Sequence, residues 1–250
     1  MFEIDTHDLT RKFGEFTAVA GLSLQVDRGT IFGFLGPNGA GKSTTVGMLT
    51  GLLQPTAGDA FIGGVSILSS PLEVKKRIGV LPENLALFTS LTIWEHLMMV
   101  GPIYGLTRNE TERRGEELLK YLDLWQSRHT FVDEASHGMR KKCSLAMALI
   151  HNPAVLFLDE PFEGIDPISS RYIKDLLLLM AKKGTTIFLT SHVLEVVERL
   201  VDSFAIIVSG EIVCQQTMAE TNRGGESLET LFLEHVGGYQ PAELEWIGGH

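Results

Sequence analysis

The chain has 250 residues, with 21 Lys and Arg against 31 Asp and Glu, and a formal net charge of −10. This length suits one large α/β domain. The acidic balance argues against DNA or RNA as the main partner, because binding to a nucleic-acid backbone depends on cationic side chains. The two cysteines, Cys143 and Cys214, are far apart and outside any metal-ligand pattern, and residues 1–5 lack the basic and apolar regions of a signal peptide.

Apolar runs along the chain predict several strands and one helical block. Residues 2–9, 18–26 and 30–35 are short apolar segments typical of strands, and the third of them leads directly into a glycine-rich loop. Val46, Leu49 and Leu53 then follow at helical spacing. From Pro71 to about Ile150 the pattern is mostly helical, and strand character returns at residues 154–158, 185–190 and 204–208. We therefore expect a parallel sheet interrupted by helices.

The glycine-rich loop carries the strongest motif. Residues 36–43 match the phosphate-binding pattern G-x-x-x-x-G-K-[ST] between a predicted strand and a predicted helix. Backbone N–H groups of such a loop, together with the N-terminus of the following helix, bind phosphate oxygens. Lys42 can reach the β- and γ-phosphates, and the Ser43 hydroxyl can join a Mg²⁺ shell. The predicted ATP-binding residues are Gly36, Pro37, Asn38, Gly39, Ala40, Gly41, Lys42, Ser43 and Thr44.

A pair of acids ends the apolar run at residues 154–158. Asp159 and Glu160 follow this predicted buried strand, and ligands of α/β sheets bind at the carboxyl ends of strands. Asp159 is suited to hold Mg²⁺, and Glu160 can polarise the water that attacks the γ-phosphate. The alternative is an ordinary pair of solvated acids after a strand.

The order of these motifs resembles the nucleotide-binding domain of ABC transporters, from about residue 2 to residue 236. The resemblance implies that Phe13 stacks on adenine, although an aromatic of a buried strand is the alternative. It also implies that residues 78–83 form a Q-loop, in which Glu83 replaces the usual glutamine as a Mg²⁺ ligand. Residues 164–167 look like the D-loop and include Asp166, and His192 resembles the histidine that contacts the γ-phosphate.

The signature segment departs most from the family. The family pattern is Leu-Ser-Gly-Gly-Gln, and residues 135–139 read Ala-Ser-His-Gly-Met, which keeps Ser136 and Gly138 ahead of a predicted helix. In the family this segment binds the γ-phosphate held by the partner subunit, so the resemblance implies a dimer that closes on ATP. A plain helix cap is the alternative.

The fold class that we predict is α/β, a P-loop NTPase core with a mostly parallel sheet, N-terminal antiparallel strands and an inserted helical subdomain. Residues 1–236 are expected to form one ABC-type ATPase domain with the helical subdomain at about residues 84–150. Residues 237–250 are expected to form a loose C-terminal tail.

The resemblance implies an ATPase with ATP and Mg²⁺ as cofactors and with Lys42, Glu160 and His192 as catalytic residues. It further implies an ATP-dependent homodimer or heterodimer that drives a separate transmembrane permease from the cytoplasmic face of the membrane. Glu83 and the altered signature look most like subunits of ABC-2-type exporters. The alternatives are a non-transport ABC ATPase that acts on ribosomes or DNA, and a regulatory subunit that binds ATP with little turnover.

The apolar segment at residues 85–107 is not expected to cross a membrane, because Glu95 and His96 lie near its middle and Gly101-Pro102 would break a helix. Its large apolar side chains predict a docking surface for the permease. The alternative is that they fill the core of the helical subdomain.

Overall fold

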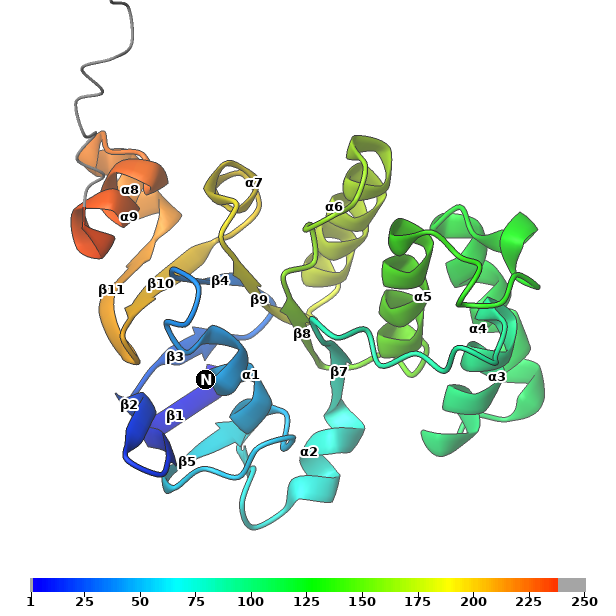
Figure 1. Ribbon diagram of the computed structural model, residues 1–250, viewed down its shortest axis with the longest axis horizontal. Helices are drawn as coiled ribbons and strands as arrows, with labels where there is room; N and C mark the ends of the chain where they lie inside the picture. The colour runs from blue at the N-terminus through cyan, green and yellow to red at the C-terminus, as the bar shows by residue number, and fades with distance from the viewer. Residues whose placement is uncertain (1, 238–250) are drawn as a thin grey trace, which may run out of the picture.

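The structure of the protein is a computed structural model that describes residues 2–237 (Figure 1). Its larger sheet has six strands in the order β11-β10-β4-β9-β8-β7. Neighbouring strands from β10 to β7 are parallel, and β11 is antiparallel to β10. The strands are β4 (Ile31–Leu35), β7 (Ile78–Leu81), β8 (Val155–Asp159), β9 (Thr186–Ser191), β10 (Ser203–Val208) and β11 (Glu211–Thr217).

A second, antiparallel sheet forms mostly from the N-terminal part of the chain. It contains β1 (Phe2–Phe13), β2 (Phe16–Leu22), β3 (Gln25–Asp27), β5 (Ala57–Ile62) and β6 (Val65–Ser66). The single strand predicted at residues 18–26 is wrong, because two strands occur there. Both strands pair with β1, and the Thr6 hydroxyl of β1 binds the chain at the break between them: it donates to Leu22 O (3.0 Å) and accepts from Leu24 N–H (2.8 Å). The mixed architecture confirms the predicted fold class.

Several of the helices begin at residues that suit a helix start. Thr92 and Thr217 each form a capping box with a glutamate three residues later. The helices are α1 (Lys42–Leu49), α2 (Pro71–Arg77), α3 (Ile93–Ile103), α4 (Arg108–Tyr121), the 3₁₀ turn η1 (Trp125–Ser127), α5 (His137–Leu149), α6 (Pro167–Lys182), α7 (Leu194–Glu198), α8 (Met218–Gly224) and α9 (Leu228–Val236). Leu53, expected on the helix that follows the glycine-rich loop, lies beyond the end of α1.

The helical reading of residues 71–150 is wrong at β7. This four-residue strand pairs in parallel with β8 and forms the edge of the larger sheet. A Cβ at Gly79 would overlap the carbonyl oxygen of Ala148, so glycine allows α5 to pack closely on the strand. Four apolar residues are too few to show a helix or strand period, which explains the error.

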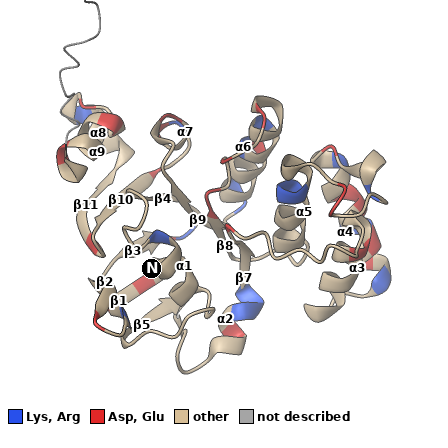
Figure 2. Ribbon diagram, viewed as in Figure 1, with Lys and Arg blue, Asp and Glu red and all other residues tan. Residues whose placement is uncertain are grey.

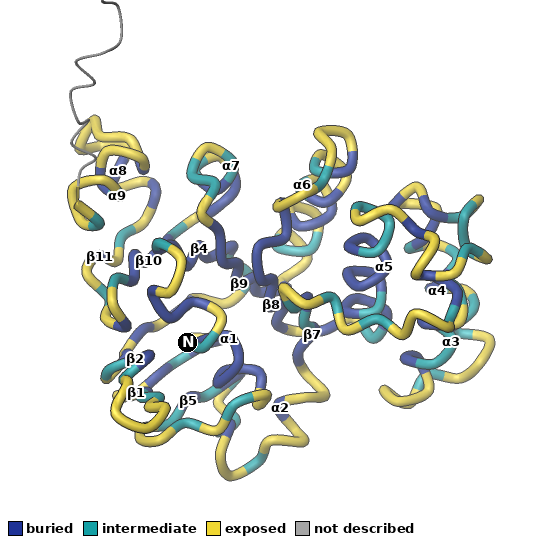
Figure 3. The backbone as a smooth tube through the Cα atoms, viewed as in Figure 1, coloured by how far each residue is buried: buried dark blue, intermediate teal, exposed yellow. Residues whose placement is uncertain are grey.

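Buried apolar side chains cover both faces of the larger sheet. In β4, Ile31 and Leu35 belong to one apolar cluster, whereas Phe32 and Phe34 belong to the cluster between the two sheets. Figure 3 shows β4, β8, β9 and β10 as an almost continuous buried centre. Burial on both faces explains why these strands read as unbroken apolar runs in the sequence.

The predicted helical subdomain, residues 84–150, contains α3, α4, η1 and α5. Figure 1 shows α5 between the strands β7 and β8 on one side and α3 and α4 on the other. Helix α4 buries Thr111, Gly115 and Leu119 and pairs its outer charges along the helix, where Figure 2 shows red and blue segments. This division of the chain stays a prediction. Of the tail predicted at residues 237–250, residues 238–250 lie outside the described residues.

The segment at residues 85–107 contributes both core and surface. Ile93 and Leu97 are fully buried, and Trp94, Met98 and Met99 pack against the same core. Large apolar side chains that remain exposed in this segment are Phe88, Ile103 and Tyr104. Across residues 2–237, none of the helices combines the length and the apolar character needed to span a membrane.

Candidate functional site

The phosphate-binding motif folds as a tight loop between β4 and α1. Gly41 has a φ of 111° as the N-cap of α1, a conformation that glycine adopts without strain. A Cβ on Gly36 would overlap the carbonyl oxygen of Ile207, and a Cβ on Gly41 would lie 2.6 Å from Ala18 O. The loop therefore needs these glycines, and the N-terminus of α1 adds a positive partial charge to the site.

Lys42 is buried within this loop, with 6% of the residue exposed. Its Nζ donates to Gly36 O (2.8 Å) and Pro37 O (3.2 Å), and lies 3.9 Å from Glu160 Oε1. A lysine held in this way puts a positive charge in the loop, and the next residue, Ser43, is exposed. Such an arrangement suits the binding of phosphate oxygens.

A pocket of about 470 Å³ opens beside the loop. It brings together ten of the residues that the sequence predicted: Phe13, Asn38, Gly39, Gly41, Lys42, Ser43, Thr44, Glu83, Glu160 and His192. Three further lining residues, Phe16, Ala18 and Glu163, were missed, because none of them belongs to a motif. The one signal in the sequence that could have found them is that each lies close in the sequence to a predicted site residue.

The two predicted acids stand at the end of β8 with different surroundings. The Thr190 hydroxyl on β9 donates to Asp159 Oδ1, and the same hydroxyl accepts from Glu160 N–H at 3.0 Å. Asp159 is 4% exposed and Glu160 is 8% exposed. Glu160 has a φ of 48°, a left-handed conformation that is uncommon for a non-glycine residue.

His192 follows β9 and lies against Glu160. Its Nδ1 is 3.0 Å from Glu160 Oε1, and its backbone N–H donates to Glu160 Oε2 at 3.3 Å. The His192 side chain is 43% exposed and lines the pocket. A carboxylate next to an imidazole and a lysine can accept a proton from water while positive charge faces a phosphate.

The site suits a metal ion that arrives with phosphates. Ser43 and Glu83 line the pocket with oxygen atoms, and Asp159 ends the neighbouring strand. Within the described part of the chain, no three His, Cys, Asp or Glu side chains are grouped so that they could hold a metal ion by themselves. Mg²⁺ is usually bound through one or two carboxylates plus substrate phosphates, so this donor set fits it.

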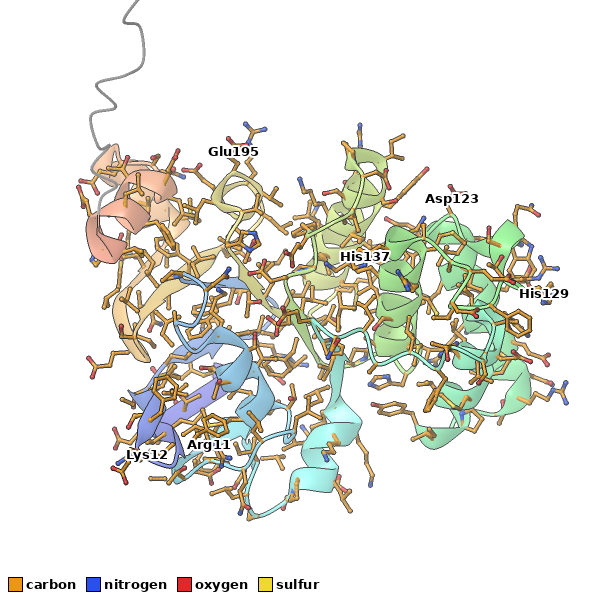
Figure 4. All side chains as sticks on the ribbon, in the orientation of Figure 1. Arg11, Lys12, Asp123, His129, His137 and Glu195 are labelled. Atoms are coloured by element: carbon orange, nitrogen blue, oxygen red, sulfur yellow. The ribbon has the colours of Figure 1, made fainter. Side chains whose placement is uncertain are left out.

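Two exposed aromatic rings form one end of the pocket. Phe13 is 45% exposed and Phe16 is 63% exposed, so neither serves as a core residue. The Arg11 guanidinium, which Figure 4 labels, lies 4.5 Å from the centre of the Phe13 ring and donates to Gln54 O at 2.7 Å. The contact covers one face of the Phe13 ring. An open aromatic ring of this kind can stack on a nucleotide base.

Three predicted residues lie together outside the pocket. Ser136 caps α5 by accepting from Met139 N–H (3.2 Å), and Asp166 caps α6. Hydrogen bonds from Ser169 lower the pKa of the Asp166 carboxyl. A Cβ on Gly138 would lie 4.0 Å from Asp166 Oδ2, so both helix starts belong to one surface.

His137, labelled in Figure 4, lies on the same surface. A Cβ on Gly164, which has a φ of 67°, would lie 3.0 Å from His137 Cδ2. The altered signature therefore contacts the loop that leads to Asp166. Within one chain this surface does not line the pocket.

Comparison with known proteins places this geometry in a family. Residues 19–163, more than half of the chain, match the family described as "ABC transporter". The linearmycin resistance ATP-binding protein LnrL of Bacillus subtilis (strain 168) is 36% identical over 235 residues, which cover 93% of this chain and 76% of that protein.

Solved structures agree with this assignment. A structure described as the ATP-binding subunit of an ABC transporter has a TM-score of 0.87 and 31% identity, and the match covers 94% of this chain and 99% of that one. A dimeric bacterial ABC transporter cassette has a TM-score of 0.80, 23% identity and coverage of 86% and 98%, and shares the fold. The chain therefore belongs to the ABC transporter family and is one of its ATP-binding subunits, an ABC transporter ATPase.

Proposed function

We propose that the pocket beside α1 is the place where this ABC transporter ATPase binds and hydrolyses ATP. The observation that carries the proposal is that one pocket combines the phosphate-binding loop, Lys42 and the buried Glu160, with Lys42 Nζ 3.9 Å from Glu160 Oε1. Anion-binding groups thus lie next to a carboxylate that can activate water.

Each predicted residue then has a role in the proposed site. The loop residues 36–44 hold the phosphates, with Lys42 at the β- and γ-phosphates. Glu160 accepts a proton from the attacking water. His192 holds the Glu160 carboxylate, and the His192 side chain also contacts the γ-phosphate. Phe13 stacks on adenine through its open face.

A metal ion completes the proposed site. Ser43, Glu83 and Asp159 would hold Mg²⁺ together with the phosphates, directly or through water. When bound, the ion supplies neutralisation of the phosphate charge. The role of the chain is to keep these oxygen donors at the strand ends where the loop presents the phosphates.

We propose further that two subunits close on ATP. Ser136, Gly138 and Asp166 form an exposed surface away from the pocket of their own chain, which supports their use on the nucleotide of a second subunit. Helix starts favour anions, so the N-terminus of α5 suits a γ-phosphate. The second subunit is either a copy of this chain or a different ATPase subunit.

The transport step needs a membrane protein, and we propose a separate permease bound at the cytoplasmic face of the membrane. A largely apolar groove of about 560 Å³ supports this proposal, because it adjoins the segment that follows Glu83. Leu52, Leu85, Ala86 and Tyr104 are among its lining residues. A change at the γ-phosphate can thus move the wall of this groove.

The direction of transport that we propose is export. The support comes from the name of LnrL, a resistance protein that is 36% identical to this chain over 93% of its length. Substrate choice would then rest with the permease rather than with the ATP pocket.

Steady-state ATP hydrolysis measured with and without a co-purified membrane partner tests this function. We expect Mg²⁺-dependent phosphate release that changes when the partner is present. A chain that binds ATP but releases no phosphate in either state would instead support the regulatory subunit. Co-purification with ribosomes or DNA, in place of a membrane protein, would support the non-transport alternative.

A further inference from the structure

Helix α5 carries a buried lysine, Lys141, whose side chain reaches the turn that follows β8. Lys141 is 3% exposed, and its Nζ donates to Glu160 O at 2.5 Å and to Glu163 O at 2.7 Å. In Figure 1, α5 stands next to β7 and β8, at the border between the sheet and the other helices. The lysine therefore connects the helical part of the chain to the backbone turn that carries the Glu160 carboxylate.

The turn at residues 160–163 needs such support. Glu160 has a φ of 48°, and left-handed backbone of this kind costs free energy in a residue with a Cβ, so it persists only where neighbours hold it. The Thr190 hydroxyl accepts from Glu160 N–H on one side of this residue, and Lys141 binds its carbonyl on the other. Glu163 N–H also donates to Glu160 O at 3.3 Å, which closes the turn.

The surroundings of the Lys141 ammonium are acidic. Burial lowers the pKa of Lys141, whereas Glu163, Glu160, Asp159 and Glu83 act in the opposite direction. An apolar side chain in place of Lys141 would leave the buried carbonyl oxygen of Glu160 and the partly buried one of Glu163 without this donor. Among the hydrogen bonds of the described residues, Lys141 is the one side-chain donor to the backbone carbonyls of this turn.

We propose that Lys141 is a positioning residue for hydrolysis, which holds the turn at residues 160–163 so that the Glu160 carboxylate faces the phosphate-binding loop. This inference rests on the proposed role of Glu160 as the catalytic base. Lys141 does not line the ATP pocket, so it acts through Glu160 and not on the nucleotide.

The neighbouring lysine provides a matched control. Lys142 lies on the same helix, is 6% exposed, and has a pKa that burial lowers as well. Its Nζ donates to Asp123 O at 3.5 Å, on a different part of the chain. Loss of a buried lysine from α5 is thus common to both substitutions, and the contact with the catalytic turn is specific to Lys141.

The test compares Lys141→Met, Lys141→Arg and Lys142→Met in the full-length chain by kcat, KM for ATP, ATP affinity and Tm. A reacting group displaced by roughly 1 Å can cost about 10²-fold in rate, so we expect Lys141→Met to lower kcat by about 10- to 100-fold with KM and ATP affinity nearly unchanged. Lys141→Arg should restore most of kcat. Lys142→Met should lower Tm to a similar extent and keep kcat.

A wild-type kcat in a folded Lys141→Met variant would overturn the proposal, and so would an equal loss of kcat in Lys142→Met. Should Lys141→Met not fold, Lys141→Gln takes its place, because it keeps an amide donor of shorter reach. A kcat lowered about tenfold in that variant supports the proposal, and a wild-type kcat contradicts it.

A double-mutant cycle separates this inference from the function on which it rests. Glu160→Gln alone tests the catalytic base. If Lys141 acts through Glu160, then Lys141→Met should slow turnover in the parent chain and add little in the Glu160→Gln background. Equal effects in both backgrounds would show that Lys141 acts elsewhere, even if Glu160 is the base.

Discussion

Replacement of Glu160 by glutamine removes the proposed base with little change in shape. The side chain is nearly buried, and its two oxygens lie 3.0 Å from His192 Nδ1 and 3.3 Å from His192 N. Glutamine fills the same space and can still accept the backbone N–H of His192. The pocket should therefore keep its form, and only the negative charge and the proton acceptor are lost.

The expected loss of turnover is the usual contribution of a positioned base. A positioned base contributes about 10²–10⁴ to the rate, or about 3–5 kcal/mol in activation free energy. The Glu160 carboxylate also lies 3.9 Å from Lys42 Nζ, so its loss frees the lysine charge to face phosphate. We expect Glu160→Gln to turn over about 10²–10⁴ more slowly than the parent chain while it binds ATP at least as tightly.

Phosphate release at saturating ATP and Mg²⁺ measures this turnover, and calorimetric titration measures ATP affinity. Glu163→Gln is a matched control, because Glu163 lines the same pocket but is exposed and forms no ion pair with Lys42 within residues 2–237. The control should keep kcat within about threefold of the parent. If Glu160→Gln kept more than roughly a tenth of the parent turnover, Glu160 would not be the base.

The other predictions concern the loop, the metal, the dimer and the partner. Lys42→Ala should weaken ATP binding by about 10- to 100-fold in a titration, since a hydrogen bond to a charged group contributes roughly 1.5–3 kcal/mol, and unchanged affinity would contradict this. Glu83→Gln should weaken the Mg²⁺ dependence of ATP binding because a carboxylate opposes the phosphate charge without metal, and identical Mg²⁺ titrations would remove Glu83 from the metal site. In Glu160→Gln, the molecular mass in solution should double when ATP is added, and a mass that ignores ATP would argue against closure of two subunits. Leu52→Glu places a charge in the apolar groove, so it should leave ATP binding intact yet stop co-purification with the permease. The control Leu233→Glu, on the distant α9, should still co-purify with the permease. If both variants retained the permease equally, docking would lie elsewhere.

The parts that were predicted from the sequence are those in which adjacent residues carry the chemistry. The loop at residues 36–43 gathers its glycines, lysine and serine in one run, so the amino-acid sequence alone was enough to place it between a strand and a helix. Asp159 and Glu160 likewise follow one apolar run. The comparisons confirm the family, the fold class and the ATPase activity that these motifs predicted.

Features made by residues distant in the sequence escaped prediction. Thr190 holds both Asp159 and Glu160 from a neighbouring strand 30 residues away from Glu160, and Lys141 reaches the same turn from a helix. Nothing in either local sequence shows these contacts. The docking prediction for residues 85–107 was limited in the same way. Ile93 and Leu97 are core residues, and hydropathy alone does not distinguish them from their exposed apolar neighbours.

Helix α5 links two parts of the proposed mechanism that the sequence suggested separately. Ser136 at its start belongs to the surface proposed to meet the nucleotide of a second subunit, and Lys141 holds the turn of Glu160 in its own chain. Five residues of helix separate them by about 7.5 Å along the axis, a distance over which a helix is rigid. A shift of the α5 N-terminus on closure would therefore reach the Glu160 turn directly. The ATP-dependent mass of Glu160→Gln tests the surface at Ser136, and the turnover of the Lys141 variants tests the contact about one and a half turns further along the same helix.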